Sequence, residues 1–188
     1  MTIRLRPATL DDATDIAALT SIAGEGLPET VWKGMLHRGE TALDVGARCV
    51  SQMEGKFSWK NATVAELDGK TAGMMISYVT ASDPVPLTED MHPIIRPLTL
   101  LENQALETRY IYVLATYEQF RGKGIAHCML EDAEAHPGKR GVSVITTNRN
   151  AQRLAFYEKM GYRDIAQAPV IKTNWNTPNE SWHLLLKP

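Results

Sequence analysis

Apolar residues recur along the chain at two spacings, every second residue and every third or fourth residue, which are the periods of half-buried strands and amphipathic helices. The period-two segments predict strands over residues 3–6, 62–67, 72–79, 110–116, 142–146, 162–166 and 181–186. The helical spacings predict helices over residues 12–23, 28–36, 41–50, 98–106, 124–135 and 151–160. This order indicates an α/β (α+β) fold, a mixed central sheet of about seven strands with helices on both faces.

Local signals predict where several of these elements begin and end. Asp11 or Asp12 is expected to cap the first helix, and the Gly-Glu-Gly segment 24–26 is expected to end it. The Asp-Gly-Lys segment 68–70 predicts a tight hairpin between two antiparallel strands. Residues 82–97 contain four prolines and little periodicity, which predicts a surface loop.

Length and composition exclude several classes of protein. The 188 residues suffice for one domain with a full core, so a single domain over residues 1–188 is expected. A formal net charge of −2 argues against a general nucleic-acid or membrane-surface binder. Cys49 and Cys128 lack a partner motif and the five histidines lack metal-ligand spacing, so no disulfide framework and no metal are assigned. Since no apolar run approaches ~20 residues, a soluble, cytoplasmic protein is expected.

Residues 110–126 join an apolar strand to a helix through a basic turn that contains Gly122 and Gly124. The free N–H groups of a helix N-terminus and the positive end of its dipole favour an anion at that position. The two glycines let the backbone approach a ligand closely, and Arg121 and Lys123 add positive charge. The turn therefore predicts a phosphate site, with an ordinary strand-to-helix connection as the alternative.

Two common phosphate loops do not fit this turn. No Ser or Thr follows a Gly-Lys pair at P-loop spacing, and Gly122-x-Gly124 is followed by His127 where the dinucleotide fingerprint has a third glycine. The turn instead resembles the pyrophosphate loop Q/R-x-x-G-x-G/A of the GNAT superfamily, the acyl-CoA-dependent N-acyltransferases. In this chain the loop reads Arg121-x-x-Gly124-x-Ala126.

A second block of sequence resembles the other signature of the same superfamily. It consists of Asn150 at a helix start, the aromatic pair Phe156-Tyr157, and Gly161-Tyr162 opening a strand. Both blocks occur in the expected order and at the expected separation. The resemblance covers most of the chain in outline, its specific motifs lie between residues 110 and 162, and it implies a GNAT fold.

The resemblance implies that acetyl-CoA is the co-substrate and that several groups share its binding. The N–H groups expected at the pyrophosphate belong to Arg121, Gly122, Lys123, Gly124, Ile125 and Ala126. The backbone expected to pair with pantetheine belongs to Leu114, Ala115 and Thr116, with Asn150 and Tyr157 as further contacts. The superfamily also uses a backbone N–H on the thioester carbonyl, which is assigned here to Leu114. Asn150 could instead serve only as a helix N-cap.

Tyr157 matches the position that serves in many GNAT members as general acid to the departing thiolate. An unperturbed tyrosine, with a pKa of ~10, stays protonated at neutral pH and is a weaker acid than a thiol of pKa ~8.5. Tyr157 is therefore assigned a catalytic role. The alternative is that Phe156 and Tyr157 only pack their helix on the sheet.

The acceptor amine must lose a proton, because an amine of pKa ~10.4 is almost fully protonated at neutral pH. Some relatives place a Glu eleven residues before the basic residue of the loop, and this chain has Tyr110 there. Tyr110 is assigned a catalytic role, in which it would accept the proton through a relay of water. Tyr112 could take the place of Tyr110 in this relay. The candidate carboxylate bases are Glu25, Glu29, Glu107 and Glu118, each of which could also be an ordinary surface carboxylate.

In GNAT proteins the helical region after the first strand usually shapes the acceptor pocket. Residues 24–32 occupy that region, so Glu25, Glu29 and Trp32 are predicted substrate-binding residues, with core packing as the alternative for Trp32. Tyr117 follows the motif strand and is expected to face the thioester cleft.

The leading hypothesis is an N-acetyltransferase that uses acetyl-CoA on a primary amine of a small molecule or peptide, by direct attack in a ternary complex. One alternative is a non-catalytic acyl-CoA-binding sensor, and another is an acyltransferase for a macromolecular acceptor. The absence of a basic face argues against aminoacyl-tRNA as that acceptor. A homodimer could form by pairing of an exposed C-terminal strand. The identity of the amine, the length of the acyl group and the general base are left open.

Overall fold

The structure is a computed structural model that describes residues 2–148 and 151–188. The chain divides into two compact units, Met1–Tyr78 with Tyr112–Asp132 (unit 1) and Val79–Ile111 with Ala133–Pro188 (unit 2). Seven strands in the described part of the chain follow the order β1-β2-β3-β4-β5-β7-β6. This mixed sheet confirms the predicted fold class, while the expectation of a single domain stays a prediction.

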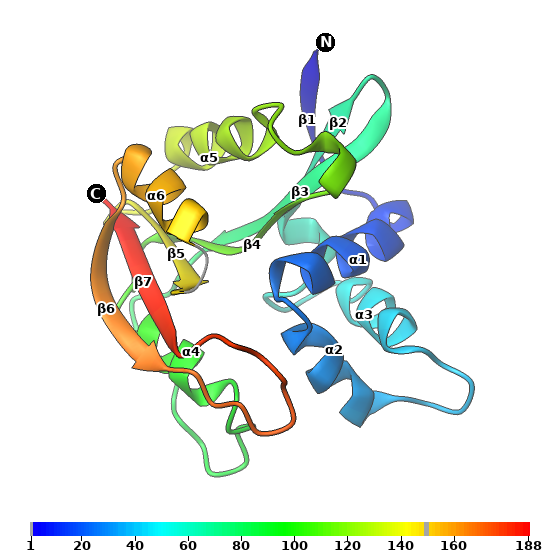
Figure 1. Ribbon diagram of the computed structural model, residues 1–188, viewed down its shortest axis with the longest axis vertical. Helices are drawn as coiled ribbons and strands as arrows, with labels where there is room; N and C mark the ends of the chain where they lie inside the picture. The colour runs from blue at the N-terminus through cyan, green and yellow to red at the C-terminus, as the bar shows by residue number, and fades with distance from the viewer. Residues whose placement is uncertain (1, 149–150) are drawn as a thin grey trace. The chain divides into compact units, whose positions relative to one another are not determined.

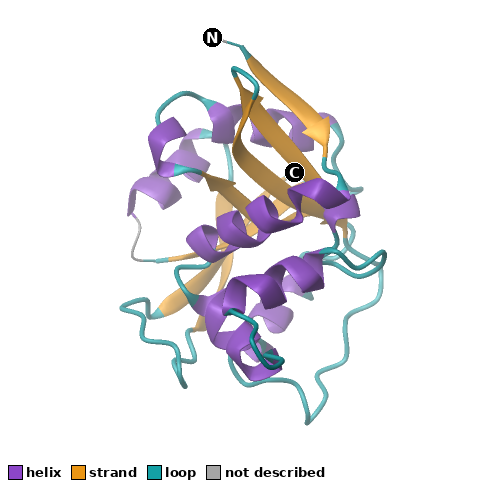
Figure 2. Ribbon diagram, turned by 90° about the vertical axis from the view of Figure 1, so that its right-hand side faces the viewer, coloured by secondary structure: helices purple, strands orange, loops and turns teal. Residues whose placement is uncertain are grey.

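Unit 1 contains the N-terminal strands and helices together with the phosphate-loop segment. Its strands are β1 (Ile3–Pro7), β2 (Ala62–Leu67), β3 (Lys70–Val79) and the end of β4 (Arg109–Thr116). The last residue of β3, Val79, is assigned to unit 2. Its helices are α1 (Ala13–Ala23), α2 (Leu27–Trp32), α3 (Ala42–Val50) and the first part of α5 (Ile125–Ala135). β1 pairs antiparallel with β2, and the two strands lie side by side in Figure 2.

Strands β1, β2 and β3 of unit 1 pair antiparallel, and helices of the same unit lie on both faces of these strands (Figure 1). Residues on β3 alternate between the faces. Met74 and Ile76 belong to the same core cluster as residues of α1, whereas a Cβ at Gly73 would lie 3.2 Å from both Ile125 and Met129 of α5. Helices therefore cover opposite faces of β3, as the sequence predicts.

The hairpin predicted at residues 68–70 is present. β2 and β3 pair from Ala62↔Ile76 to Leu67↔Lys70, which leaves a two-residue turn. Asp68 and Gly69 in that turn have φ angles of 50° and 77°. Such turns favour Asp-Gly because both central residues adopt positive φ, so the local sequence accounts for the connection.

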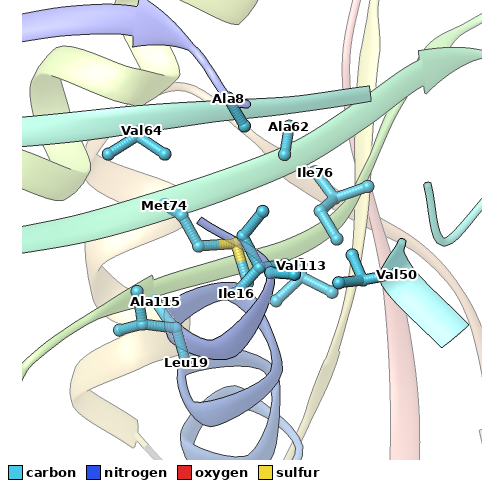
Figure 3. Close-up of a cluster of buried hydrophobic side chains, with 11 residues drawn as sticks. Ala8, Ile16, Leu19, Val50, Ala62, Val64, Met74, Ile76, Val113 and Ala115 are labelled. Carbon is cyan, nitrogen blue, oxygen red and sulfur yellow. The ribbon is translucent and has the colours of Figure 1, made fainter. Parts of the chain in front are cut away.

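The core of unit 1 forms between α1, α3 and one face of the strands (Figure 3). Its buried members are Ala8, Ala13, Ile16, Leu19, Val50, Ala62, Val64, Met74, Ile76, Val113 and Ala115. Complete burial of a side chain such as Leu19 or Ile76 contributes roughly 1.5–3 kcal/mol to stability. Because Val113 and Ala115 are members, the motif strand β4 is anchored in this core.

Asp12 occupies the N-cap position of α1, which agrees with the expectation that Asp11 or Asp12 caps this helix. Asp12 precedes the helix but makes no capping bond to it. Its carboxylate accepts two hydrogen bonds of 2.8 Å from Arg6 and one of 2.7 Å from the backbone N–H of Thr9. The hydrogen bonds from Arg6 hold the pKa of Asp12 below its ordinary value. The buried carboxylate is thus used to fix β1 to α1.

Unit 2 contains the start of β4 and most of the C-terminal half. Its other elements are α4 (Arg96–Glu102), the end of α5, β5 (Val142–Thr147), α6 (Ala151–Lys159), β6 (Arg163–Pro169) and β7 (Ser181–Lys187). β4 pairs parallel with β5 through Arg109↔Val142, Tyr110↔Ser143 and Ile111↔Val144. β5 pairs antiparallel with β7, and β7 with β6.

The C-terminal strand corrects one expectation from the sequence. β7 lies between β5 and β6 and is therefore internal, so it cannot pair across a dimer. The strand that ends the sheet on this side is β6. Which of the last two strands lies at the edge of the sheet depends on contacts between distant segments, and the sequences of the two strands do not reveal it.

The short helix predicted over residues 98–106 is α4, which begins at Arg96 and ends at Glu102. Pro97 lies in its first turn, where a missing N–H group costs nothing. The predicted loop that precedes it is mostly exposed. Asn103, just after α4, fixes this loop through two hydrogen bonds. Its side-chain oxygen accepts from the N–H of Val85 at 2.8 Å, and its side-chain NH₂ group donates to the carbonyl of Val85 at 2.9 Å.

Candidate active site

The glycine turn between β4 and α5 has the backbone that a close ligand approach requires. Gly122 and Gly124 have φ angles of 75° and 82°, and both residues are exposed. A Cβ built on either residue would meet no protein atom within 4 Å. Glycine is therefore needed for the backbone conformation, and open space lies in front of both positions.

The turn leads directly into the N-terminus of α5. The N–H of Cys128 donates to the carbonyl of Gly124 at 3.0 Å, so the N–H groups of residues 125–127 precede the first helical bonds. Ile125 and Met129 are buried and fix α5 against the sheet of unit 1. These N–H groups and the positive dipole end are therefore held by a rigid element.

Two cationic side chains lie in the same turn. Arg121 and Lys123 are exposed, and the Lys123 ammonium lies 5.2 Å from the centre of the Phe120 ring. This cation–π contact holds the ammonium near the turn at little cost. The turn therefore combines free N–H groups, positive charge and open space, which is what a pyrophosphate group requires.

The end of β4 presents the backbone that the sequence assigns to pantetheine. Val113 and Ala115 face the core, whereas Leu114 and Thr116 are only partly buried. The N–H of Tyr117 donates to the carbonyl of Ala72 at 2.9 Å, which anchors the end of the strand to β3. The Leu114 N–H as a thioester donor stays a prediction.

Tyr157 lies on α6 in unit 2 and is 4% exposed. Its ring centroid is 5.5 Å from those of Phe156 and Tyr162. Burial raises the pKa of Tyr157 to about 12. Complete proton transfer from such a hydroxyl to a thiolate of pKa ~8.5 is uphill by about 5 kcal/mol. The environment therefore favours a hydrogen bond to a charged sulfur over early proton transfer.

The other residues assigned to the two motifs have different outcomes. Tyr110 is 4% exposed in unit 2, where β4 pairs with β5. Its predicted catalytic role is untested. Asn150 lies outside the described residues. Tyr110 and Tyr157 thus belong to unit 2, and the glycine turn belongs to unit 1.

Of the predicted acceptor residues, Glu29 has the most unusual environment. One oxygen of its carboxylate, Oε2, is buried without a hydrogen-bond partner. Glu25, in contrast, is exposed and has a φ angle of 52°. A buried carboxylate oxygen without a partner is energetically costly, which makes this environment unusual, and the predicted contact of Glu29 with the acceptor stays a prediction.

Trp32 is 5% exposed and packs with Ala17 and Val45 in a second small core cluster of unit 1. A Cβ at Gly46 would lie 2.7 Å from the indole ring, so α3 accommodates Trp32 only because it has glycine there. The packing alternative is thus realised for Trp32. Its predicted contact with the acceptor stays a prediction.

Trp32 is also the buried end of an aromatic row that the sequence does not reveal. Phe57 lies 6.0 Å from Trp32 and 6.4 Å from Tyr112, and Tyr78 lies 6.1 Å from Tyr112. The side chain of Tyr112 is 42% exposed, and the Lys56 ammonium lies 5.6 Å from the centre of the Tyr78 ring. The row leads from the core of unit 1 to its surface.

Tyr117 is held by α1. Its hydroxyl donates to the carboxylate of Asp15 at 2.5 Å. Burial and this carboxylate both raise the pKa of Tyr117. The hydroxyl is therefore committed to Asp15, and the predicted contact with substrate would use the ring.

The remaining carboxylates proposed as bases lie at the surface or in ion pairs. Glu107 accepts a hydrogen bond from Lys139 at 2.9 Å, and Glu118 is exposed. Within residues 2–148 and 151–188, no cluster of three or more His, Cys, Asp or Glu side chains is placed to hold a metal ion. In the same described part of the chain, no helix has the length and apolar character to cross a membrane.

Comparison with known proteins identifies the family. Residues 58–164 match the family model described as "Acetyltransferase (GNAT) domain". The chain therefore belongs to the GNAT acetyltransferases and is an acyltransferase enzyme. Members of this family use acetyl-CoA and act on amine substrates. No curated protein matches the chain.

Solved structures share the fold over nearly the whole chain. An N-acetyltransferase from Staphylococcus aureus Mu50 is 21% identical with a TM-score of 0.64, and the alignment covers 98% of this chain and 100% of that one. Mosquito arylalkylamine N-acetyltransferase like 5b is 20% identical with a TM-score of 0.63 and 99% of each chain covered. An acetyltransferase from Thermus thermophilus is 16% identical, with a TM-score of 0.58 and coverages of 98% and 96%. At these identities the likeness concerns the fold.

Proposed function

We propose that the protein transfers an acetyl group from acetyl-CoA to a primary amine of a small molecule or peptide, by direct attack in a ternary complex. One observation carries this proposal. Gly122 and Gly124 adopt positive φ in front of open space, at the N-terminus of α5 and beside two cations. This arrangement supports pyrophosphate binding at residues 121–126, with Arg121 and Lys123 neutralising its charge.

The rest of the donor would bind along the motif strand. The backbone of Leu114, Ala115 and Thr116 would pair with the pantetheine amides, and the Leu114 N–H would donate to the thioester carbonyl. Acetyl-CoA supplies an acyl carbonyl that is activated by its thiolate leaving group. Tyr157 donates a hydrogen bond to the sulfur as negative charge develops there, which its protonated state at neutral pH allows. Asn150 is proposed as a further contact to pantetheine.

On the acceptor side, we assign recognition to residues of unit 1. The unpartnered oxygen of Glu29 would accept hydrogen bonds from the ammonium form of the substrate. Trp32, Tyr117 and Glu25 stay as proposed contacts. The exposed ring of Tyr112 extends this surface with an aromatic face that suits an apolar or aromatic part of the acceptor. Tyr110 is proposed to act through a water relay.

The proposal also concerns where the protein works and how it could assemble. Cys49 and Cys128 are free thiols, which suits a reducing compartment such as the cytoplasm. If a homodimer forms through strand pairing, β6 is the strand that offers an edge on the C-terminal side of the sheet.

Acetyl-CoA is expected to raise the melting temperature of the protein. Ligand at 100 times its Kd stabilises a protein by about 2.7 kcal/mol, which corresponds to a rise of roughly 5–10 °C for a chain of this size. Differential scanning fluorimetry measures this shift, and free CoA should compete for the same site. An unchanged melting temperature at millimolar acetyl-CoA would refute the proposed donor.

A further inference from the structure

A hydrogen bond between Tyr117 and Asp15 joins the segment before the glycine turn to α1, although the two residues are 102 positions apart in the sequence. The Tyr117 hydroxyl donates to Oδ1 of Asp15 at 2.5 Å, and both side chains are partly buried. Hydrogen bonds to a charged acceptor are shorter and stronger than bonds between neutral groups. Burial and the Asp15 carboxylate raise the pKa of Tyr117, so its hydroxyl keeps the proton that it donates. Both residues and the glycine turn belong to unit 1.

The Asp15 end of this bond belongs to a rigid element. Asp15 lies in the first turn of α1, where the positive end of the helix dipole favours a carboxylate. The next residue, Ile16, is completely buried and belongs to the same core cluster as Val113 and Ala115 of β4. The backbone of Asp15 is therefore fixed by the core of unit 1, and its carboxylate offers Tyr117 an acceptor at a defined place.

Tyr117 is held at three points just after β4. Its N–H donates to the carbonyl of Ala72 on β3 at 2.9 Å, and its hydroxyl donates to α1. Its carbonyl accepts from the N–H of Phe120 at 2.9 Å, which closes a 3-10 turn. The N–H of Arg121 then donates to the carbonyl of Glu118 at 3.1 Å. These bonds connect β3 and α1 to the first residue of the proposed pyrophosphate site.

The glycine turn itself lies in open space between two fixed ends. Gly122 and Gly124 are exposed, and a Cβ on either residue would meet no protein atom within 4 Å. At the far end of the turn, Ile125 is buried and fixes the start of α5. At the near end, the chain leaves the 3-10 turn that Tyr117 anchors. The directions of the N–H groups in the glycine turn therefore depend on these two ends.

We propose that Asp15 and Tyr117 are positioning residues for the pyrophosphate turn, and that their hydrogen bond holds this turn in the conformation that binds acetyl-CoA. This inference rests on the proposed function. It gives a role to Asp15, which belongs to neither sequence motif, and adds a role in donor binding to Tyr117. A site whose supporting residues are fixed in advance loses less conformational freedom when its ligand binds. Without the bond, acetyl-CoA has to order the turn itself.

Tyr117→Phe tests this inference, because the change removes the hydroxyl and keeps the ring. We expect the variant to bind acetyl-CoA and free CoA about tenfold more weakly in isothermal titration calorimetry. The factor should be the same for both ligands, because they share the pyrophosphate and differ only at the sulfur. Asp15→Ala should give the same loss, and the double variant should lose no more than either single variant, since all three lack one bond. Asp15→Asn keeps an oxygen acceptor and should regain most of the affinity.

Kinetics and a matched control separate positioning from a general loss of stability. With an amine that the enzyme acetylates, Tyr117→Phe should raise the KM for acetyl-CoA about tenfold and leave kcat within about twofold. Asp44→Ala is the control, because Asp44 lies in the first turn of α3, another helix of unit 1. Its carboxylate accepts from the N–H and the hydroxyl of Thr41 at 2.8 Å and 2.7 Å. This variant loses a helix cap but should bind acetyl-CoA as the wild type does.

Three results would overturn the positioning role. The first is wild-type affinity for acetyl-CoA in both Tyr117→Phe and Asp15→Ala. The second is an equal loss of affinity in Asp44→Ala, and the third is a fall in kcat at unchanged KM, which would place the Tyr117 hydroxyl at the reacting atoms. Because calorimetry needs no turnover, a wild type that binds acetyl-CoA but releases no thiol with any amine would overturn the proposed reaction alone. A wild type that does not bind acetyl-CoA would overturn both proposals.

Discussion

Replacing Gly124 by glutamate is expected to abolish acetyl-CoA binding, with a loss of affinity of at least about 100-fold. The side chain would enter the open space in front of the turn, because a Cβ at this position meets no protein atom within 4 Å. It would place a negative charge where the pyrophosphate is proposed to bind. Two like charges in contact cost several kcal/mol in a partly desolvated site. Isothermal titration calorimetry with acetyl-CoA measures the loss.

Gly39→Glu is the matched control for this change. Gly39 also has positive φ, 88°, and also faces open space, so both variants suffer a comparable backbone strain of roughly 1–2 kcal/mol. Gly39 follows η2 (Lys33–Met35), far along the chain from the turn. This control should bind acetyl-CoA as the wild type does. Undiminished affinity in Gly124→Glu would show that the pyrophosphate does not bind at this turn.

The Tyr157→Phe variant is expected to lose about 10²-fold in kcat while its affinity for acetyl-CoA stays within threefold. The change removes only the hydroxyl, and the aromatic packing with Phe156 and Tyr162 persists. A hydrogen bond that strengthens as sulfur becomes negative acts on the transition state and not on the bound substrate. Steady-state kinetics of thiol release, combined with calorimetry, separates the two effects.

Tyr162→Phe is the control for the loss of a buried aromatic hydroxyl in the same cluster. Its ring centroid lies 5.5 Å from that of Tyr157, and burial also raises the pKa of this tyrosine. The control should retain kcat within about twofold. If Tyr157→Phe were equally active, the hydroxyl would have no part in the chemistry, and the packing role would be the whole explanation for the residue.

The donor side of the site is readable from the sequence because it depends on local chemistry. Gly122 and Gly124 are required by their positive φ angles, and the apolar spacing of α5 follows the helical period. The hairpin at Asp68 and Gly69 is predictable for the same reason. In each case the signal and the structure that it predicts lie within a few residues.

Features that depend on contacts between distant segments are not predictable in this way. The sequence predicts Asp12 as a helix cap, but it does not predict that Arg6 binds the carboxylate of this residue in a partly buried ion pair. The sequence favours core packing over a pocket wall for Trp32, but the glycine that makes room for its ring lies on another helix and is not predictable from the residues around Trp32. The aromatic row from Trp32 through Phe57 and Tyr112 to Tyr78 likewise joins residues from four separate segments.

The contact between Asp164 and His183 on β6 and β7 shows the same limit more sharply. His183 has no motif around it, and its partner Asp164 lies nineteen positions earlier on another strand. Their contact depends on the register of β6 with β7 and on a shift within it. A single sequence contains little information on strand register, because a shift by two residues preserves the same alternation of buried and exposed side chains. Contacts of this kind therefore emerge only from the folded chain.

The most direct test of the account is amine-dependent release of free thiol from acetyl-CoA by the wild-type protein. A panel of amino acids, polyamines, aminoglycosides, arylalkylamines and peptides can be screened with a thiol reagent, and mass spectrometry then identifies the acetylated product. We expect at least one primary amine to accelerate thiol release well above the rate with acetyl-CoA alone, and to be recovered as its N-acetyl derivative. Binding of acetyl-CoA without release of thiol for any amine would contradict the proposed function and would indicate an acyl-CoA sensor.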